Sequence, residues 1–307
     1  MHLTHLKQIF DLIKNRPKQH LISAWAVDHH TIEATVKAVD MGIVDATLVG
    51  DEKKILHIFK TGGIDPARFN IVNERTDTSA VEKAVELINR KKGSLLMKGN
   101  LSTDKYIRAI LHKERGLMDP GSVLSHVTVM KLSSYHKLLI VGDVAVIPLP
   151  DLKQKVAIAN YLINTAKALG IKEPKLSVLA VTEQVLPNMP ACIDAALLSK
   201  MAERKQLTGA LVDGPLSLDL SINMDAVKIK GIISKVAGNA DCILFPNIES
   251  GNVFYKTTAQ YGNGEQAAIL AGARVPAVLS SRGDSTQTKL YSIALAAMLS
   301  KSSLSLK

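Results

Sequence analysis

Residues 20–50 read HLISAWAVDHHTIEATVKAVDMGIVDATLVG, and the fold class can be inferred from this stretch. It opens with the apolar run 21–27, which has the length of a buried strand. Asp28 follows as a good N-cap, and the next apolar residues recur at helical spacing as far as Gly42. A second apolar run, 46–49, closes the stretch. The order strand, helix, strand predicts a unit of the kind that builds parallel sheets.

The same alternation continues on the C-terminal side. The pattern predicts a helix to about Lys60, a strand at 69–72, a helix from Asp77 to about Lys92 and a strand at 95–97. Strands that alternate with helices are joined by right-handed crossovers. We therefore expect a mostly parallel sheet of the α/β class.

The rhythm changes in the middle of the chain. Two apolar runs, 123–132 and 138–141, flank the polar segment 133–137 and predict an antiparallel hairpin. After Pro150 the alternation resumes. The expected helices are 151–169, 191–204, a segment after Glu249 and 285–299, and the expected strands are 176–181, 209–212, 242–245 and 277–280.

A chain of 307 residues is long enough for about two domains. We expect two α/β domains with a cleft between them, residues 1–134 plus 275–307 and residues 135–274. Hydrophobic residues make up 47% of the chain but aromatic residues only 4%. Ala, Val, Ile and Leu must therefore fill the core, as is usual where helices pack on a parallel sheet.

The charge balance points to an anionic partner. Lys and Arg number 38 against 28 Asp and Glu, which gives a net charge of +10. The cations are scattered rather than massed in a stripe with aromatic residues, which favours a phosphate-bearing metabolite and argues against nucleic acid.

The sequence has two cysteines, no apolar signal segment and no run of about 18 apolar residues. We therefore expect a cytoplasmic protein without a membrane span.

Two familiar patterns fail on their context. Residues 262–267, GNGEQA, match the dinucleotide-binding letters GxGxxA, but they follow a predicted helix where that motif needs a strand. A glycine pair that ends a helix accounts for them better. His29 and His30 lack a third ligand, and Asp28 beside them caps a helix, so we expect no metal site.

Four loops follow directly on predicted strands, where open α/β sheets bind their ligands. The first, 98–103, combines Lys98 with free amides at the start of the helix that carries Arg108, and it suits a phosphate. The second is 213–216, and the third, 246–252, leads to Tyr255 and Lys256. Helix capping, turn formation and solvation remain the alternatives at each of them.

The fourth loop, 280–285, brings together a hydroxyl, a guanidinium, a glycine and a carboxylate at the N-terminus of the last helix. Such a set can bind an anion, stabilise an oxyanion and accept a proton. A capping box with solvated neighbours is the alternative.

At these loops the chain resembles the phosphate acetyl/butyryl transferase family, and in particular its butyryl branch. The resemblance runs through six segments in order. They are LMKGNLSTDKYIRAIL (96–111), GLMDPGSVLSHVTVMKL (116–132), IVGDVAVIPLPDLKQK (140–155), LVDGPLSLDLSI (211–222), VAGNADCILFPNIESGNVFYK (236–256) and VPAVLSSRGDSTQTKLYSIALA (275–296).

The resemblance implies a fold like that of isocitrate and isopropylmalate dehydrogenases and a homodimer. It implies the reversible reaction of acyl-CoA with orthophosphate to give acyl phosphate and coenzyme A, with coenzyme A as a substrate and no cofactor required.

The resemblance also implies site residues. Ser281 and Arg282 match a Ser-Arg pair that serves the oxyanion and the phosphate in the acetyl branch. The Asp that acts as base in that branch falls on Thr288 here, so we nominate Asp284 as the base. The residues expected to bind substrate are Lys98, Gly99, Thr103, Arg108, Asp213, Gly214, Pro215, Asn252, Tyr255 and Lys256.

Two other functions fit parts of the pattern. A metal- and NAD-dependent dehydrogenase of the same fold would need a cluster of acidic metal ligands, which the sequence does not present. A non-catalytic protein that binds coenzyme A or a phosphometabolite is compatible with Thr288 in place of the acetyl-branch Asp.

Overall fold

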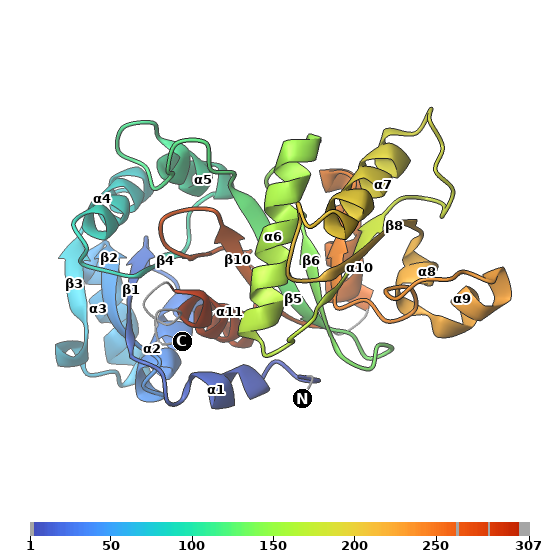
Figure 1. The fold of residues 1–307 in the computed structure, drawn as a ribbon. Helices are drawn as coiled ribbons and strands as arrows, with labels where there is room; N and C mark the ends of the chain where they lie inside the picture. The colour runs from blue at the N-terminus through green and yellow to red at the C-terminus, as the bar shows by residue number, and fades with distance from the viewer. Residues whose placement is uncertain (1–2, 262–263, 282, 301–307) are drawn as a thin grey trace. The chain divides into compact units, whose positions relative to one another are not determined.

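The computed structural model describes residues 3–261, 264–281 and 283–300. The chain folds into two compact units (Figure 1). Unit 1 comprises residues 1–8 and 125–266, and unit 2 comprises residues 9–124 and 267–307. The contact-based units differ from the expected division in three places. Residues 1–8 and 125–134 lie with the second expected domain, and residues 267–274 lie with the first.

Unit 2 carries one part of the parallel sheet, with the strand order β3-β2-β1-β4-β11-β10. Neighbours from β3 to β11 pair in parallel, and β10 pairs with β11 in antiparallel fashion. Its elements are β1 (Gln19–Ala24), α2 (His29–Asp40), β2 (Val44–Gly50), α3 (Glu52–Gly62), η1 (Pro66–Arg68), β3 (Asn70–Asn73), α4 (Asp77–Asn89), β4 (Leu95–Lys98), α5 (Thr103–Leu111), β11 (Ala277–Val278), α11 (Thr286–Leu299), most of α1 (Gln8–Ile13) and most of β10 (Glu265–Ala271).

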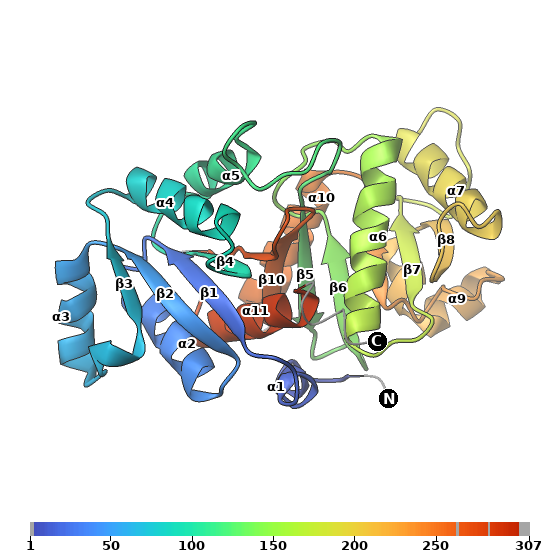
Figure 2. The ribbon, with the colours of Figure 1, turned by 60° about the vertical axis from the view of Figure 1, so that its left-hand side comes forward.

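Helices cover both faces of these strands. Figure 2 shows α2 and α3 on one side of β1, β2 and β3, and α4 on the other side. This arrangement follows from right-handed crossovers, because the chain moves outward from β1 to β3 and then returns to β4. Helix α11 packs against α2, β4 and β11, and every residue from Lys289 to Met298 in it is buried.

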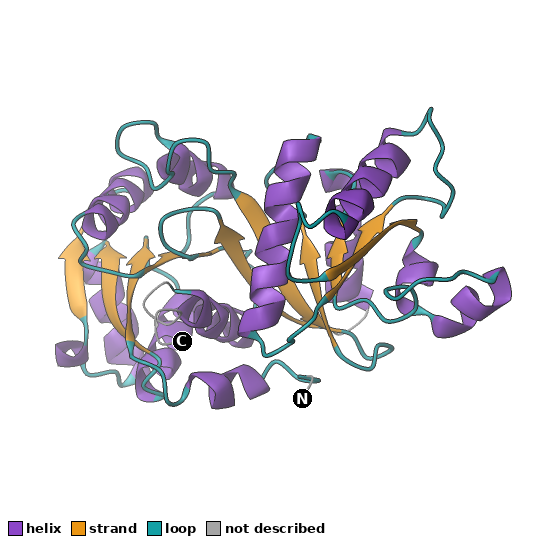
Figure 3. Ribbon diagram, viewed as in Figure 1, coloured by secondary structure: helices purple, strands orange, loops and turns teal. Residues whose placement is uncertain are grey.

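Unit 1 has the strand order β5-β6-β9-β7-β8, with β5 and β6 antiparallel and the remaining neighbours parallel. Figure 3 draws the strands in orange and the helices in purple. Helix α6 packs across β5, β6, β7 and β9. The elements are β5 (Ser125–Lys131), β6 (Leu138–Gly142), α6 (Leu152–Ala168), β7 (Lys175–Leu179), α7 (Pro190–Glu203), β8 (Leu211–Leu216), α8 (Leu218–Ile222), α9 (Met224–Lys230), β9 (Cys242–Leu244) and α10 (Ile248–Tyr261).

Local sequence chemistry explains several helix boundaries. The side chain of Asp28 accepts a hydrogen bond from the amide of Thr31 and caps α2, as predicted. Asp151 and Gln154 form a reciprocal capping box at the start of α6. Helix α3 ends at Gly62, and its C-cap Gly63 has a φ of 63°, in the left-handed region that favours glycine.

The predicted α/β class, the mostly parallel pairing and the hairpin are confirmed. The predicted end of the strand 209–212 is wrong, because β8 continues to Leu216. The interpretation of 246–252 as a loop is also wrong in part, because α10 begins at Ile248.

Sequence reasoning missed β10, α1, α8 and α9, which are short or follow a glycine pair. Gly262 and Asn263 lie outside the described residues, and α10 ends directly before them, where the sequence predicted a helix end.

Candidate active site

Three loops meet at one edge of the unit 2 strands. Strand β4 pairs in parallel with β1 on one side and with β11 on the other, so their carboxyl ends point the same way. The segments that follow these strands, 25–28, 99–102, and 279–281 with 283–285, therefore share one edge. This edge, which we call the carboxyl edge, is where α/β sheets place their ligands.

Gly99 brings two of the loops into close contact. Its amide donates to the carbonyl of Ala24 at 2.9 Å, and the amide of Asn100 donates to the carbonyl of Trp25 at 3.0 Å. A Cβ atom at position 99 would lie 2.3 Å from the Trp25 carbonyl oxygen, so a larger residue cannot fit without moving the backbone. The structure thus gives Gly99 a packing role, and its predicted contact with substrate stays a prediction.

The loop after β11 brings Ser281 and Asp284 together. Oδ2 of Asp284 accepts a hydrogen bond from the amide of Ser281 at 2.7 Å, and the amide of Asp284 donates to the carbonyl of Ser281 at 3.2 Å. The next residue, Ser285, caps α11 by accepting from the amide of Thr288 at 3.2 Å. The capping role belongs to Ser285, so Asp284 is not the N-cap. Arg282, the third predicted catalytic residue, lies outside the described residues.

Sequence reasoning missed Lys289, the fourth residue of α11. Its side chain is 1% exposed, and its Nζ donates to Oγ of Ser280 at 3.0 Å and to the carbonyl of Ser281 at 3.1 Å. Burial lowers the pKa of Lys289, while the carboxylates of Asp28 and Asp284 act in the opposite direction. The available signal was that Lys289 is the single charged residue in the sequence of α11, directly before its mostly apolar part.

Helix α2 also contacts the start of α11. Thr286 Oγ1 donates to Oε2 of Glu33 at 2.9 Å and lies 3.1 Å from Nδ1 of His30. Hydrogen bonds from Lys37 and Thr286 lower the pKa of Glu33. Oδ2 of Asp28 is buried, and among the described residues no hydrogen-bond partner contacts it.

The loop after β4 is held by its own lysine. Nζ of Lys98 donates to the carbonyls of Leu101 at 3.0 Å and Gly99 at 3.3 Å, and the side chain is buried. Ser102 caps α5 by accepting from the amide of Lys105, and Thr103 is the first residue of that helix. Lys98 therefore shapes the loop that was expected to bind phosphate.

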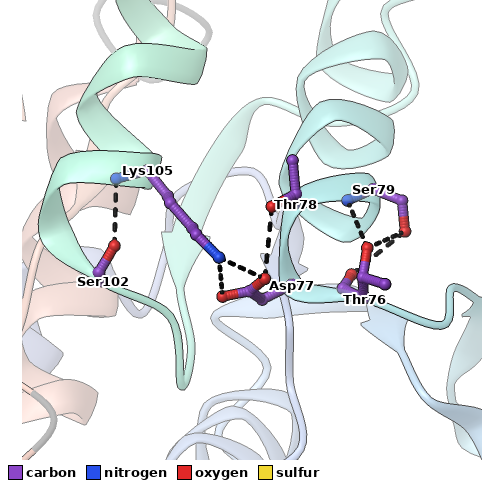
Figure 4. A network of polar contacts seen from close by, with 6 residues as sticks. All are labelled: Thr76, Asp77, Thr78, Ser79, Ser102 and Lys105. Carbon is purple, nitrogen blue, oxygen red and sulfur yellow. Dashed lines mark hydrogen bonds and ion pairs between the residues drawn. The ribbon is translucent and has the colours of Figure 1, made fainter.

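An ion pair joins the first turns of α4 and α5 (Figure 4). Nζ of Lys105 lies 2.7 Å and 2.8 Å from the two carboxylate oxygens of Asp77. Thr76 caps α4 by accepting from the amide of Ser79. The hydrogen bond from Lys105 lowers the pKa of Asp77.

Arg108 lies further along α5, in a groove of about 1050 Å³ between α4 and α5. Its side chain is 79% exposed, and its Nε donates to Asp104 at 2.9 Å. Asp104 and Lys105, in the first turn of α5, also line the groove. Arg108 is thus an accessible cation, and its predicted phosphate contact stays a prediction.

The predicted site residues of unit 1 lie on β8 and α10. Asp213, Gly214 and Pro215 are inside β8, not in a loop after it, and Oδ1 of Asp213 accepts from the amide of Gly214. Proline fits there because β8 is the last strand of the unit's sheet. Ser199 Oγ donates to the carbonyl of Gly214 at 2.9 Å, which ties β8 to α7.

Helix α10 carries the other three. Asn252 donates from Nδ2 to the carbonyl of Val144 at 2.9 Å, and Tyr255 meets the ring of His126 edge to face. Lys256 is exposed. Substrate binding by these residues stays a prediction.

Asp143, at the carboxyl end of β6, is a polar anchor that sequence reasoning did not single out. Its carboxylate is buried and accepts from the amides of Ala145, Val146 and Ile147 and from Oγ of Ser125. This set of hydrogen bonds fixes the loop after β6, which Asn252 also contacts.

Among residues 3–261, 264–281 and 283–300, no group of three or more His, Cys, Asp and Glu side chains is arranged to hold a metal ion. Within the same residues, no helix is long and apolar enough to cross a membrane.

The protein is thus of the α/β class, with three loops side by side at the carboxyl ends of parallel strands. The chain matches the family model described as phosphate acetyl/butaryl transferase over residues 4–98 and 78–297. It belongs to the phosphate acetyl/butyryl transferase family.

Individual relatives agree with this assignment. The chain is 42% identical over 292 residues to phosphate butyryltransferase of Clostridium acetobutylicum. The aligned region covers 95% of this chain and 97% of that protein. It is 38% identical over 277 residues to phosphate acetyltransferase of Rhizobium meliloti, covering 90% and 87%.

Among solved structures, the branched-chain phosphotransacylase from Enterococcus faecalis V583 superposes with a TM-score of 0.80 at 25% identity, covering 92% of this chain and 99% of that one.

Proposed function

We propose that this protein transfers a short-chain acyl group reversibly between coenzyme A and orthophosphate. In one direction acyl-CoA and phosphate give acyl phosphate and free coenzyme A. Family membership over nearly the whole chain supports this activity. The observation that carries it within the structure is the hydrogen-bonded loop of Ser281 and Asp284 before α11, at the carboxyl edge.

The chemistry explains why such a loop suits the reaction. A phosphate oxygen attacks the thioester carbonyl, whose oxygen gains negative charge as the tetrahedral species forms. The carbon–sulfur bond then breaks and coenzyme A leaves as a thiolate, which takes up a proton. We assign the oxyanion to Ser281 and nearby backbone amides, because donors aimed at a developing charge stabilise the transition state.

The remaining roles follow from charge. Arg282 and Arg108 bind phosphate together with Lys98, which shapes the loop before the helix of Arg108. When coenzyme A reacts with acyl phosphate, Asp284 accepts the proton of the thiol. A general base helps there because the thiol is largely protonated at neutral pH. Asn252, Tyr255 and Lys256 of α10 and residues 213–215 of β8 are assigned to the coenzyme A substrate.

We further propose that the acyl group is butyryl or a branched relative, since Thr288 stands where the acetyl branch has its Asp. The proposal includes a cytoplasmic homodimer that needs no cofactor or metal and a fold like that of isocitrate and isopropylmalate dehydrogenases.

A thiol-release assay tests the function. Acetyl-, propionyl-, butyryl- and branched acyl-CoA are each supplied with and without phosphate, and free thiol is followed. We expect phosphate-dependent release, with a higher kcat/KM for butyryl-CoA than for acetyl-CoA. Each added methylene in an apolar pocket contributes about 1 to 3 kcal/mol until the pocket is full. Acetyl-CoA as the best substrate would contradict the acyl preference alone.

Two outcomes would replace the proposal. Binding of acyl-CoA without any thiol release indicates a non-catalytic sensor. Reduction of a nicotinamide with a hydroxy acid, abolished by a chelator, indicates a dehydrogenase.

A further inference from the structure

Resting on the proposed function, we infer that Lys289 is a positioning residue for acyl transfer. Its buried ammonium holds the backbone of Ser281 from inside the protein, so that the hydroxyl of Ser281 faces the reacting carbonyl. Lys289 acts through Ser281 and does not itself contact substrate.

The hydrogen bonds of the loop show how this works. Ser281 is held from two directions, because its carbonyl accepts from Nζ of Lys289 at 3.1 Å and its amide donates to Asp284 at 2.7 Å. Lys289 also donates to Oγ of Ser280 at 3.0 Å. Both peptide groups that flank the Ser281 α-carbon are therefore fixed by charged side chains. Hydrogen bonds to charged groups are roughly twice as strong as those between neutral groups.

The position of Lys289 gives the loop a rigid support. Lys289 is one turn into α11, and the helix is buried from that residue to Met298. A buried helix cannot shift without opening the core, so the ammonium stays at a constant place. The loop before α11 is therefore attached to a fixed charge rather than only to its own helix cap.

The surroundings of Lys289 supply the opposite charge. The carboxylates that act on its ammonium are Asp28, from the loop after β1, and Asp284, from the loop before α11. Oδ1 of Asp28 caps α2, whereas its Oδ2 is buried without a hydrogen-bond partner among the described residues. A buried carboxylate oxygen without such a partner is costly unless a nearby positive charge compensates it, and Lys289 is such a charge.

A purely structural lysine would look different. Lys155 in unit 1 is similarly buried, but its Nζ ends directly on the carboxylate of Asp194 at 2.6 Å and joins two helices. Lys289 instead ends on a serine hydroxyl and a serine carbonyl of the loop before α11. The contrast makes Lys155→Met a matched control for Lys289→Met.

The test compares these two variants in the thiol-release assay. For Lys289→Met we expect kcat to fall roughly 10- to 150-fold, the loss from hydrogen bonds to a charged group, with little change in the KM for acyl-CoA. Its Tm should fall as well, because the buried carboxylate of Asp28 loses the charge that compensates it, and kcat is therefore compared at a temperature at which both variants are folded. Lys155→Met should lower Tm and leave kcat unchanged.

A second variant keeps the inference testable if Lys289→Met does not fold. Asp28→Asn retains the helix cap but removes one of the two carboxylates that act on Lys289. The pKa of Lys289 then falls further, so the alkaline limb of kcat against pH should move to lower pH. In the double variant Asp28→Asn/Lys289→Met, the fall in kcat should be smaller than the product of the two single falls, because both substitutions affect one charge pair.

The outcomes separate this inference from the function on which it rests. A normal kcat in folded Lys289→Met, or an unmoved alkaline limb in Asp28→Asn, overturns the role of Lys289 alone. Absence of phosphate-dependent thiol release in the unchanged protein overturns the proposed function first.

Discussion

Two buried lysines of unit 1 pair with carboxylates, and two buried lysines of unit 2 donate to oxygens of loops. In unit 1, Lys137 meets Asp241 at 2.7 Å and also donates to the carbonyl of Asn239 at 2.8 Å, and Lys155 meets Asp194 at 2.6 Å. In unit 2, Lys98 donates to loop carbonyls after β4, and Lys289 donates to a hydroxyl and a carbonyl after β11. The unit 1 lysines join elements of the fold, whereas the unit 2 lysines shape the loops at the carboxyl edge.

The difference has energetic consequences. Removing one partner of a buried ion pair leaves the other charge uncompensated, which mainly lowers stability. Removing a cation from a loop changes the placement of the groups that it holds, and small misplacements at a reacting centre mainly lower the rate. We therefore expect substitutions in unit 1 to act on stability and those at the carboxyl edge to act on turnover.

The largest effect is expected for Asp284→Asn. Loss of a base within reach of the thiol should lower kcat roughly 10²- to 10⁴-fold, while asparagine can still accept the hydrogen bond from the Ser281 amide. Thr288→Val, four residues further along the chain, provides the control and should retain most of the activity. The measurement is kcat with acyl phosphate and coenzyme A, the direction in which the thiol loses its proton. A nearly normal kcat in folded Asp284→Asn would limit this carboxylate to holding the loop.

Lys137→Met tests the unit 1 side of the comparison. Asp241 is 1% exposed, so losing its ammonium partner should cost about 3 to 5 kcal/mol of unfolding free energy. Burial lowers the pKa of Lys137, and the carboxylate of Asp241 opposes that effect. Denaturant unfolding measures the loss, and kcat of the folded protein should not change. A stable variant with a lower kcat would reverse the comparison.

Arg282→Ala should weaken the use of phosphate. Loss of a hydrogen bond between opposite charges costs about 1.5 to 3 kcal/mol, to be measured as kcat/KM for phosphate. Tm should remain the same. Equal phosphate kinetics in both proteins would make Arg282 a solvated residue.

Lys105→Ala should have the smallest effect. Its ion pair with Asp77 is partly exposed, so its removal should cost less than about 1 kcal/mol. The lowered pKa of Asp77 means that this stabilisation is present above roughly pH 4 and is lost as the pH falls through the lower folded-state value. Tm values of the two proteins should therefore differ at pH 7 and converge in strong acid. A constant difference at all pH values would assign the effect to packing.

Chain periodicity was sufficient to predict most of the fold. The apolar run 21–27 and the N-cap Asp28 predicted β1 and α2, because strand burial and helix capping depend on neighbouring residues. The end of β8 was mispredicted because Asp213 and Gly214 are typical turn residues, yet pairing with β7 holds them in a strand. Strand β10 was missed because it directly follows a glycine pair that the sequence assigns to a helix end.

The candidate site, like the fold, could be predicted from the sequence only in part. The letters SSRGDS, together with the family resemblance, were enough to nominate Ser281, Arg282 and Asp284. Residue order alone could not show that Lys289 reaches back to Ser281 or that Asp28, more than 250 positions earlier, acts on the same ammonium.

Local patterns in the sequence therefore determined the class of fold, the order of elements and the loop that carries the candidate chemistry. The tertiary structure decided which buried charges meet, because charge pairing depends on strand order and helix packing that bring distant residues together. Lys155 and Lys289 are both lysines within helices, and only the surrounding fold makes one a partner of Asp194 and the other a support for Ser281.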